Sequence, residues 1–181
     1  MRKWLMRRRL AAFERDFGYD ASYMREILDA DTTALMAMAR TMAMTQYHKD
    51  VPAEAWHAAK IAATLHEDCG PCTQLVVTMA ERDGVDPALL RALLAGDEAR
   101  MTGDAALGWR HARAVLVHDV AAAPLREEIL RRWGPRALVS VAFAIAAGRL
   151  FPTVKYGLGH GIACSRVTVG GDAVPVARRA A

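Results

Sequence analysis

The sequence predicts an all-α protein, and three observations support this fold class. Hydrophobic residues make up 53% of the chain, but aromatic residues only 7%. A core rich in Ala, Leu, Val and Met suits closely packed helices better than a β-sandwich, which favours β-branched and aromatic residues. Sustained period-two alternation is missing before residue 165, and residues that start or stop helices recur along the chain instead.

Residues 1–50 are expected to form an N-terminal helical extension. A helix over 3–17 should end at Gly18, and Asp20 should be the N-cap of a short helix that runs to residue 30. Asp31 or Thr32 then caps a third helix, which should continue to about residue 48.

The extension begins with a basic arm, and the rest of the chain is close to neutral. The five basic residues of the arm are Arg2, Lys3, Arg7, Arg8 and Arg9. We interpret the arm as a solvated helix face or a partner contact, and nucleic-acid binding is not expected.

Residues 51–160 should form the main helical domain. Asp50 and Pro52 predict the start of a helix that reaches about residue 66, with the aspartate as its cap. The next helix begins within Cys69-Gly70-Pro71-Cys72 and ends near Gly84. Further helices are expected over 87–94, 104–120, 124–133 and 136–150.

Residues 161–181 are expected to form a flexible C-terminal tail, because glycine is frequent from Gly157 onwards. A short extended piece is predicted within it, over 167–169. Cys164 also lies there, and we interpret it as a free cysteine rather than an additional resolving thiol.

The composition favours a cytoplasmic protein without a membrane span. Three cysteines do not form a disulfide framework, so a reducing compartment fits best. The arginines near the start interrupt the apolar stretch that a secretory signal needs. The longest apolar run, 137–147, is well short of the roughly 20 residues of a membrane span and indicates a buried helix.

The pair Cys69 and Cys72 is the most informative motif of the chain. Two cysteines three residues apart can lie one helical turn apart, close enough to form a disulfide. Pro71 suits a first helical turn, and a helix N-terminus favours the reactive thiolate. The motif therefore predicts a redox-active dithiol, and its position nearer the helix start favours Cys69 as the attacking thiol.

The candidate proton partners are His57, His66, Glu67 and Asp68. The nine residues between the two histidines place them on opposite faces if one helix carries both. The two acids would raise the pKa of a nearby cysteine, or would accept protons in the folded site.

Two other interpretations of the motif stay open. His66, Cys69 and Cys72 recur every three residues and, with His57 or Asp68, would supply four zinc ligands. The dithiol would otherwise be a redox sensor or a structural element of a helical module without catalytic activity. For the enzyme interpretation, no cofactor is expected.

From about residue 53 to residue 159, the chain resembles the carboxymuconolactone decarboxylase superfamily, and within it the alkylhydroperoxidase D-like branch. The resemblance rests on Asp68-Cys69-Gly70-Pro71-Cys72, on the helix end at Arg82-Asp83-Gly84-Val85, and on the helices expected around them. It implies a compact all-α domain that assembles into a homo-oligomer.

The resemblance also implies a thiol peroxidase or disulfide oxidoreductase. Its substrate would be a small hydroperoxide or disulfide, and a thioredoxin-like or lipoyl protein would reduce it again. In this branch the second cysteine, here Cys72, is the reactive one. Where the peroxidase pattern has a glutamate and a histidine, this chain has His57 and Val76. The expected site residues are Cys69, Cys72, His66, Glu67 and His57.

Overall fold

A computed structural model describes residues 2–162 and 166–176, and it confirms the all-α class. The described elements in chain order are α1 (Arg2–Phe17), α2 (Ser22–Ala30), α3 (Thr32–Arg40), α4 (Met42–Thr45), α5 (Ala53–His66), α6 (Gly70–Arg82), α7 (Pro87–Ala95), the 3-10 helix η1 (Glu98–Arg100), α8 (Gly103–Leu116), α9 (Ala122–Gly157), β1 (Arg166–Val169) and β2 (Asp172–Pro175).

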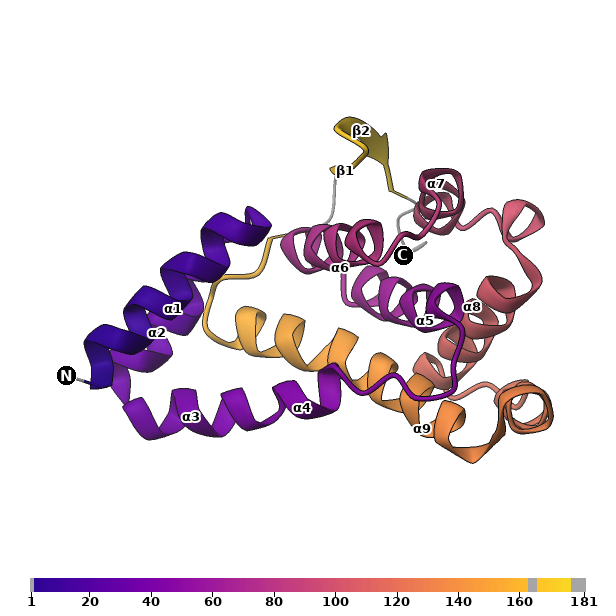
Figure 1. Cartoon of the computed structure of the whole chain (residues 1–181), viewed down its shortest axis with the longest axis horizontal. Helices are drawn as coiled ribbons and strands as arrows, with labels where there is room; N and C mark the ends of the chain where they lie inside the picture. The colour runs from indigo at the N-terminus through magenta and orange to yellow at the C-terminus, as the bar shows by residue number, and fades with distance from the viewer. Residues whose placement is uncertain (1, 163–165, 177–181) are drawn as a thin grey trace.

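Helix α5 is the centre of the main core. Every residue from Ala55 to Thr64 is buried, because α6, α8 and α9 all pack against this helix (Figure 1). Alanines keep the helix thin, so these neighbours approach its backbone closely. A helix buried on all sides is typical of the interior of a helical domain.

The N-terminal helices form a second hydrophobic cluster. Figure 1 shows α1, α2 and α3 at the end of the molecule remote from α7 and α8. The buried side chains of this cluster include Tyr19, Tyr23 and Leu28. Leu75 of α6 and Val154 of α9 pack against it, so the cluster is joined to the main core through these two helices.

The basic arm is part of α1, and two of its cations contact α2. Lys3 Nζ lies 3.0 Å and Arg7 Nη2 lies 2.5 Å from Asp29 Oδ1, and all three side chains are exposed. The arm is therefore in part a solvated helix face whose ion pairs hold α1 to α2.

Glycines end three helices at the predicted places. Gly18, Gly84 and Gly96 follow α1, α6 and α7, and each has a positive φ, at 59°, 80° and 67°. This left-handed conformation ends a helix and strains a residue that carries a Cβ atom.

Three predicted features of the N-terminal half are wrong. The N-cap position of α2 is Ala21 and not Asp20, whose carboxylate accepts from the Ser22 N–H at 2.9 Å. The third helix breaks at Thr41, whose hydroxyl donates to the Met38 carbonyl at 2.7 Å and competes with the helical hydrogen bonds. Asp50 does not cap α5. It binds Arg136 of α9 through both carboxylate oxygens, at 2.5 and 2.8 Å, and α5 begins after Pro52 without a side-chain cap.

The two helices predicted over 124–133 and 136–150 are joined in α9. Gly134, with φ 82°, makes a kink at the expected boundary, and the second half continues beyond Pro152 to Gly157. By length and composition alone α9 could cross a membrane, but 44% of its most apolar window is buried in the protein. Because buried core helices meet the same criterion, this is weak evidence for a membrane span.

Part of the expected flexible tail is an ordered hairpin. Strands β1 and β2 pair antiparallel, with Val167 opposite Val174, and the hairpin packs on α6 and α7. Val167 and Val169 are buried, which confirms the extended piece over 167–169 and orders it through the core. Residues 163–165, with Cys164, and 177–181 lie outside the described part of the chain.

Candidate functional site

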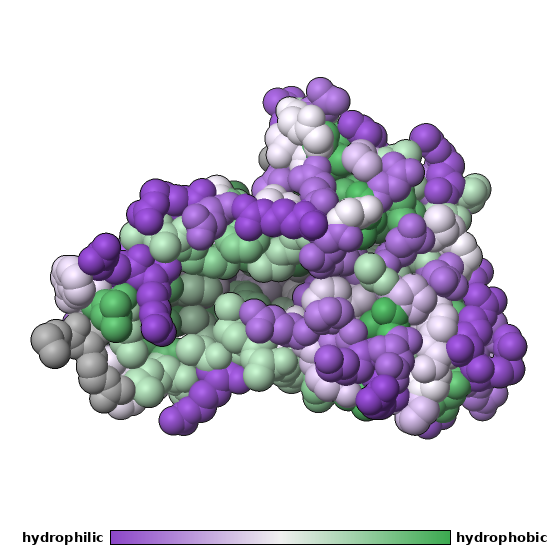
Figure 2. Space-filling view, viewed as in Figure 1, coloured by the Kyte–Doolittle hydropathy of each residue, from purple (hydrophilic) through white to green (hydrophobic). Residues whose placement is uncertain are grey.

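A cavity of about 770 Å³ lies between the two hydrophobic clusters. Residues of α1, α2, α4, α5, α6 and α9 line it. In Figure 2, the opening of the cavity is visible as a hollow lined by apolar residues. Cavities of this size hold small organic ligands in other proteins, so this one is the candidate site.

The dithiol lies beside this cavity. The sulfurs of Cys69 and Cys72 are at disulfide distance, and their Cα atoms are 5.3 Å apart. Cys69 is the N-cap residue of α6 and is fully buried, whereas Cys72 lines the cavity with 4% of its surface exposed. Cys72 is therefore the thiol that a small molecule in the cavity would meet.

Backbone hydrogen bonds hold the dithiol loop from two sides. The Cys69 N–H donates to the Thr64 carbonyl at the end of α5, at 3.3 Å. The Gly70 N–H donates to the Ile162 carbonyl at 3.0 Å. The segment that follows α9 is thus tied to the start of α6, next to the fully buried Cys69.

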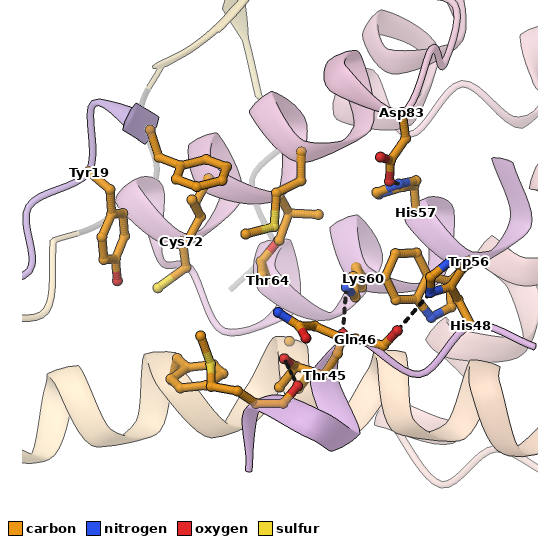
Figure 3. A pocket seen from close by; sticks show the side chains of 18 of the residues that line it. Tyr19, Thr45, Gln46, His48, Trp56, His57, Lys60, Thr64, Cys72 and Asp83 are labelled. Atoms are coloured by element: carbon orange, nitrogen blue, oxygen red, sulfur yellow. Dashed lines mark hydrogen bonds and ion pairs between the residues drawn. The ribbon is translucent and has the colours of Figure 1, made fainter. Parts of the chain in front are cut away.

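Helix α5 contributes a polar stripe to the cavity wall. Thr64, Lys60 and His57 are spaced by four and three residues, so they share one face of the helix. Figure 3 shows the stripe leading from Cys72 towards Asp83. The seven residues from Thr64 to His57 correspond to about 10 Å along the helix axis.

His57 is held by Asp83, which follows α6. The ring Nε2 lies 2.7 Å from the carboxylate Oδ2 and donates to it, because a carboxylate only accepts. Burial lowers the pKa of His57 to about 4, against the opposing effect of the Asp83 hydrogen bond. The ring is therefore neutral at pH 7, and its buried Nδ1 has no hydrogen-bond partner among the described residues.

Lys60 is a buried cation in the middle of the stripe. Its Nζ donates to the Thr45 carbonyl at 2.9 Å and lies 3.3 Å from the centre of the Trp56 ring. Within the described part of the chain, no carboxylate comes within ion-pair distance of it. Burial lowers the pKa of Lys60 to about 7, so the charged and the neutral amine coexist at neutral pH.

This burial predicts a pH dependence of stability. The unfolded chain keeps the Lys60 proton up to about pH 10.5, but the folded protein only to about pH 7, so stability rises with pH between these values. We expect Lys60→Met to be more stable than the wild type at pH 7. Between pH 7 and 9.5, we also expect the free energy of unfolding of the wild type to rise by roughly 3 kcal/mol more than that of Lys60→Met. Urea unfolding across this range measures the difference, and parallel curves for the two proteins would contradict the prediction.

The other predicted proton partners lie away from the cavity. Glu67 Oε1 lies 2.8 Å from Arg149 Nε, so this acid holds α9 to the end of α5. His66 is half-buried and does not line the cavity. The Asp68 carbonyl accepts a hydrogen bond from the Tyr156 hydroxyl at 2.8 Å. Of the predicted residues, the structure thus brings Cys69 and Cys72 together and places His57 in the cavity of Cys72.

The zinc interpretation receives no support from the described residues. Among them, no three His, Cys, Asp or Glu side chains are placed to hold a metal ion. Of the suggested ligands, the sulfurs of Cys69 and Cys72 lie at disulfide distance from each other, and Nε2 of His57 is held by Asp83.

Comparisons with known proteins do not identify a family. No family model, no curated protein and no solved structure matches this chain.

The sequence reasoning missed Lys60 and Asp83 as site residues. A signal for Lys60 was present, because it is the one lysine in an alanine-rich helix and comes three residues after His57. For Asp83 the sequence indicates only a place at a helix end. Its contact with His57 spans 26 residues of chain, which local patterns do not reveal.

Proposed function

We propose that this protein is a thiol-dependent redox enzyme that reduces hydroperoxides or disulfides by cycling Cys69 and Cys72, as the alkylhydroperoxidase D-like resemblance implies. One observation carries the proposal: the dithiol begins α6, and one of its sulfurs lies on the wall of a cavity large enough for a small organic substrate. The helix N-terminus favours thiolate over thiol there.

The hydroperoxide reaction would take three steps. The Cys72 thiolate attacks the terminal oxygen of the hydroperoxide, the O–O bond breaks, and the alkoxide leaves and takes a proton to become an alcohol. The Cys69 thiol then attacks the Cys72 sulfenic acid, which forms the disulfide and releases water. A dithiol reductant exchanges with this disulfide, restores both thiols and leaves as its own disulfide.

Lys60 and the His57–Asp83 pair are suited to the proton transfers. His57 stands where the peroxidase pattern has its glutamate, and Asp83 fixes the ring so that Nδ1 is the free base. Lys60 lies between His57 and Cys72 in Figure 3, and its pKa of about 7 suits proton donation at neutral pH. Protons would pass to the reacting oxygen through the substrate or water in the cavity.

The burial of both sulfurs favours a slender reductant. Cys69 is 0% and Cys72 4% exposed, so a lipoyl group or another small dithiol that enters the cavity reaches Cys72 more easily than a thioredoxin-like surface does. A homo-oligomer, which the resemblance implies, remains part of the proposal.

Steady-state reduction of an organic hydroperoxide with a small dithiol as electron donor tests the proposed function. We expect turnover by the wild type and only the uncatalysed rate with the double variant Cys69→Ser/Cys72→Ser. The matched control is Cys164→Ser, which removes the third cysteine and should keep full activity. Equal rates for the wild type and the double variant would refute the proposal.

A redox-sensing or structural dithiol is the second candidate, and the burial of both sulfurs favours it. A sensor would form its disulfide once with a stoichiometric oxidant and would not be reduced again at a useful rate. Counting the hydroperoxide consumed per chain separates the two functions, because only the enzyme exceeds one equivalent in the presence of reductant.

A further inference from the structure

The cavity has a polar end and an apolar end. Aromatic side chains of α1 and the following segment form the apolar end: Phe13 and Phe17 lie 5.0 Å apart between ring centres, and Phe13 and Tyr19 lie 5.6 Å apart. The polar end holds Lys60. In Figure 3, Tyr19 and Cys72 lie on one side of the cavity, and Lys60, Gln46 and His48 lie on the other.

We propose that this cavity binds amphipathic organic anions, with the carboxylate on Lys60 and the apolar chain along the aromatic wall of α1. Resting on the proposed redox function, this makes organic hydroperoxides that carry both a carboxylate and a long apolar chain the substrate class.

The argument for an anion starts from the charge of Lys60. A buried ammonium group costs free energy unless an anion pairs with it, and here Nζ contacts a backbone carbonyl and the Trp56 ring. Asp83 acts on the amine only from beyond ion-pair distance, and a ligand carboxylate would supply a direct countercharge. It would also raise the pKa of the amine and so hold it in the charged form, which leaves the proton transfers for these substrates to the His57–Asp83 pair.

The other charged groups of the cavity already have partners. Arg82 donates to the Asp16 carbonyl, and its guanidinium carbon lies 4.1 Å from the centre of the Phe17 ring. Its charge is therefore already in contact with a carbonyl and an aromatic face. Asp83 is bound by His57, and its side chain is 56% exposed, so solvent screens its repulsion of a ligand anion. The remaining titratable residues of the lining are Tyr19, Tyr23, His48, His57 and Cys72.

The position of Cys72 links this binding mode to chemistry. The sulfur lies beyond Thr64 from Lys60, so a chain whose carboxylate is held at Lys60 runs past Cys72 towards the aromatic wall. A hydroperoxide group part-way along such a chain would be presented to the thiolate. Hydrogen peroxide has neither the head group nor the chain and would gain nothing from these contacts.

Binding of dodecanoate tests the proposal without using the thiols. Isothermal titration of the oxidised wild type and of Cys69→Ser/Cys72→Ser should give similar affinities, because neither protein turns over. We expect Lys60→Met to lose about tenfold or more in affinity, the usual size of a hydrogen bond to a charged group. The matched control is Lys49→Met, which changes an exposed lysine and should bind as the wild type does.

Two further probes isolate the head group and its charge. Dodecanol has the same chain without the carboxylate and should bind the wild type more weakly than dodecanoate does. The preference should vanish in Lys60→Met and should fall as the pH rises above about 7, where Lys60 loses its proton. An equal preference in Lys60→Met and the wild type would overturn the proposal.

Other outcomes also decide the question. The anion site is overturned if dodecanoate does not bind. It is also overturned if the affinity for dodecanoate falls as the protein concentration rises, because a second copy of the chain then fills the cavity. Equal rates for a fatty-acid hydroperoxide and its methyl ester overturn the substrate class. A protein that binds dodecanoate through Lys60 but reduces no hydroperoxide keeps the anion site and refutes the proposed function instead.

Discussion

Replacing Cys72 with serine is expected to abolish hydroperoxide reduction, even in a single turnover. Cys72 is the sulfur on the cavity wall, whereas Cys69 is fully buried and does not line the cavity. A substrate in the cavity therefore reaches Cys72 first. The Cys69→Ser variant should keep the attacking thiol and stop after one round, because no second thiol resolves the sulfenic acid.

Mass spectrometry with a sulfenic-acid trap distinguishes the two roles. After one equivalent of hydroperoxide, Cys69→Ser should carry the trap on Cys72, and Cys72→Ser should carry none. The opposite labelling would show that position at the helix start, rather than access from the cavity, decides which cysteine attacks. Labelling of both variants would mean that either cysteine can attack the hydroperoxide, so that the fold does not determine which one attacks and which one resolves.

Replacing Gly108 with alanine is expected to destabilise the protein by about 3 kcal/mol or more. A Cβ atom at this position of α8 would lie 2.2 Å from the carbonyl oxygen of Ala55, which belongs to the backbone of α5. Backbone atoms cannot rotate out of the way, so α5 and α8 would have to move apart at the centre of the core. Because alanine is the better helix former, the loss would arise from this clash alone.

Gly103 is the matched control for this substitution. It lies at the start of the same helix, and a Cβ atom there would meet nothing within 4 Å. We therefore expect Gly103→Ala to change the free energy of unfolding by no more than a few tenths of a kcal/mol, or to raise it slightly. Urea unfolding of both variants measures the difference. Similar stabilities would mean that α5 and α8 are packed less closely than the structure describes.

Several helix ends were predictable because their causes are local. Glycine reaches a positive φ without strain, and this property alone placed the ends of α1, α6 and α7 at Gly18, Gly84 and Gly96. Pro71 and the cysteine spacing likewise placed the dithiol at the start of α6. Asp50 was predicted wrongly because its partner, Arg136, is 86 residues away.

The cavity was not predictable in the same way. Its two ends come from segments far apart in the chain, α1 and α2 on one side and α5 with the residue after α6 on the other. The periodicity of apolar residues indicates which face of a single helix is buried. It does not show which faces of different helices line a common cavity. Glu67 shows the reverse error: it is adjacent to the dithiol loop in sequence, but it is bound to Arg149.

The sequence by itself determined the helical class, the main helix ends and the presence of a Cys69–Cys72 pair at a helix start, because all of these depend on residues within a few positions of one another. Only the tertiary structure decided that Cys72 rather than Cys69 lines the cavity, and that His57 is held by Asp83. It also decided that Lys60 is buried without a carboxylate at ion-pair distance among the described residues. Burial and charge pairing depend on which segments pack together, and a distant segment supplies most of the surroundings of each of these groups.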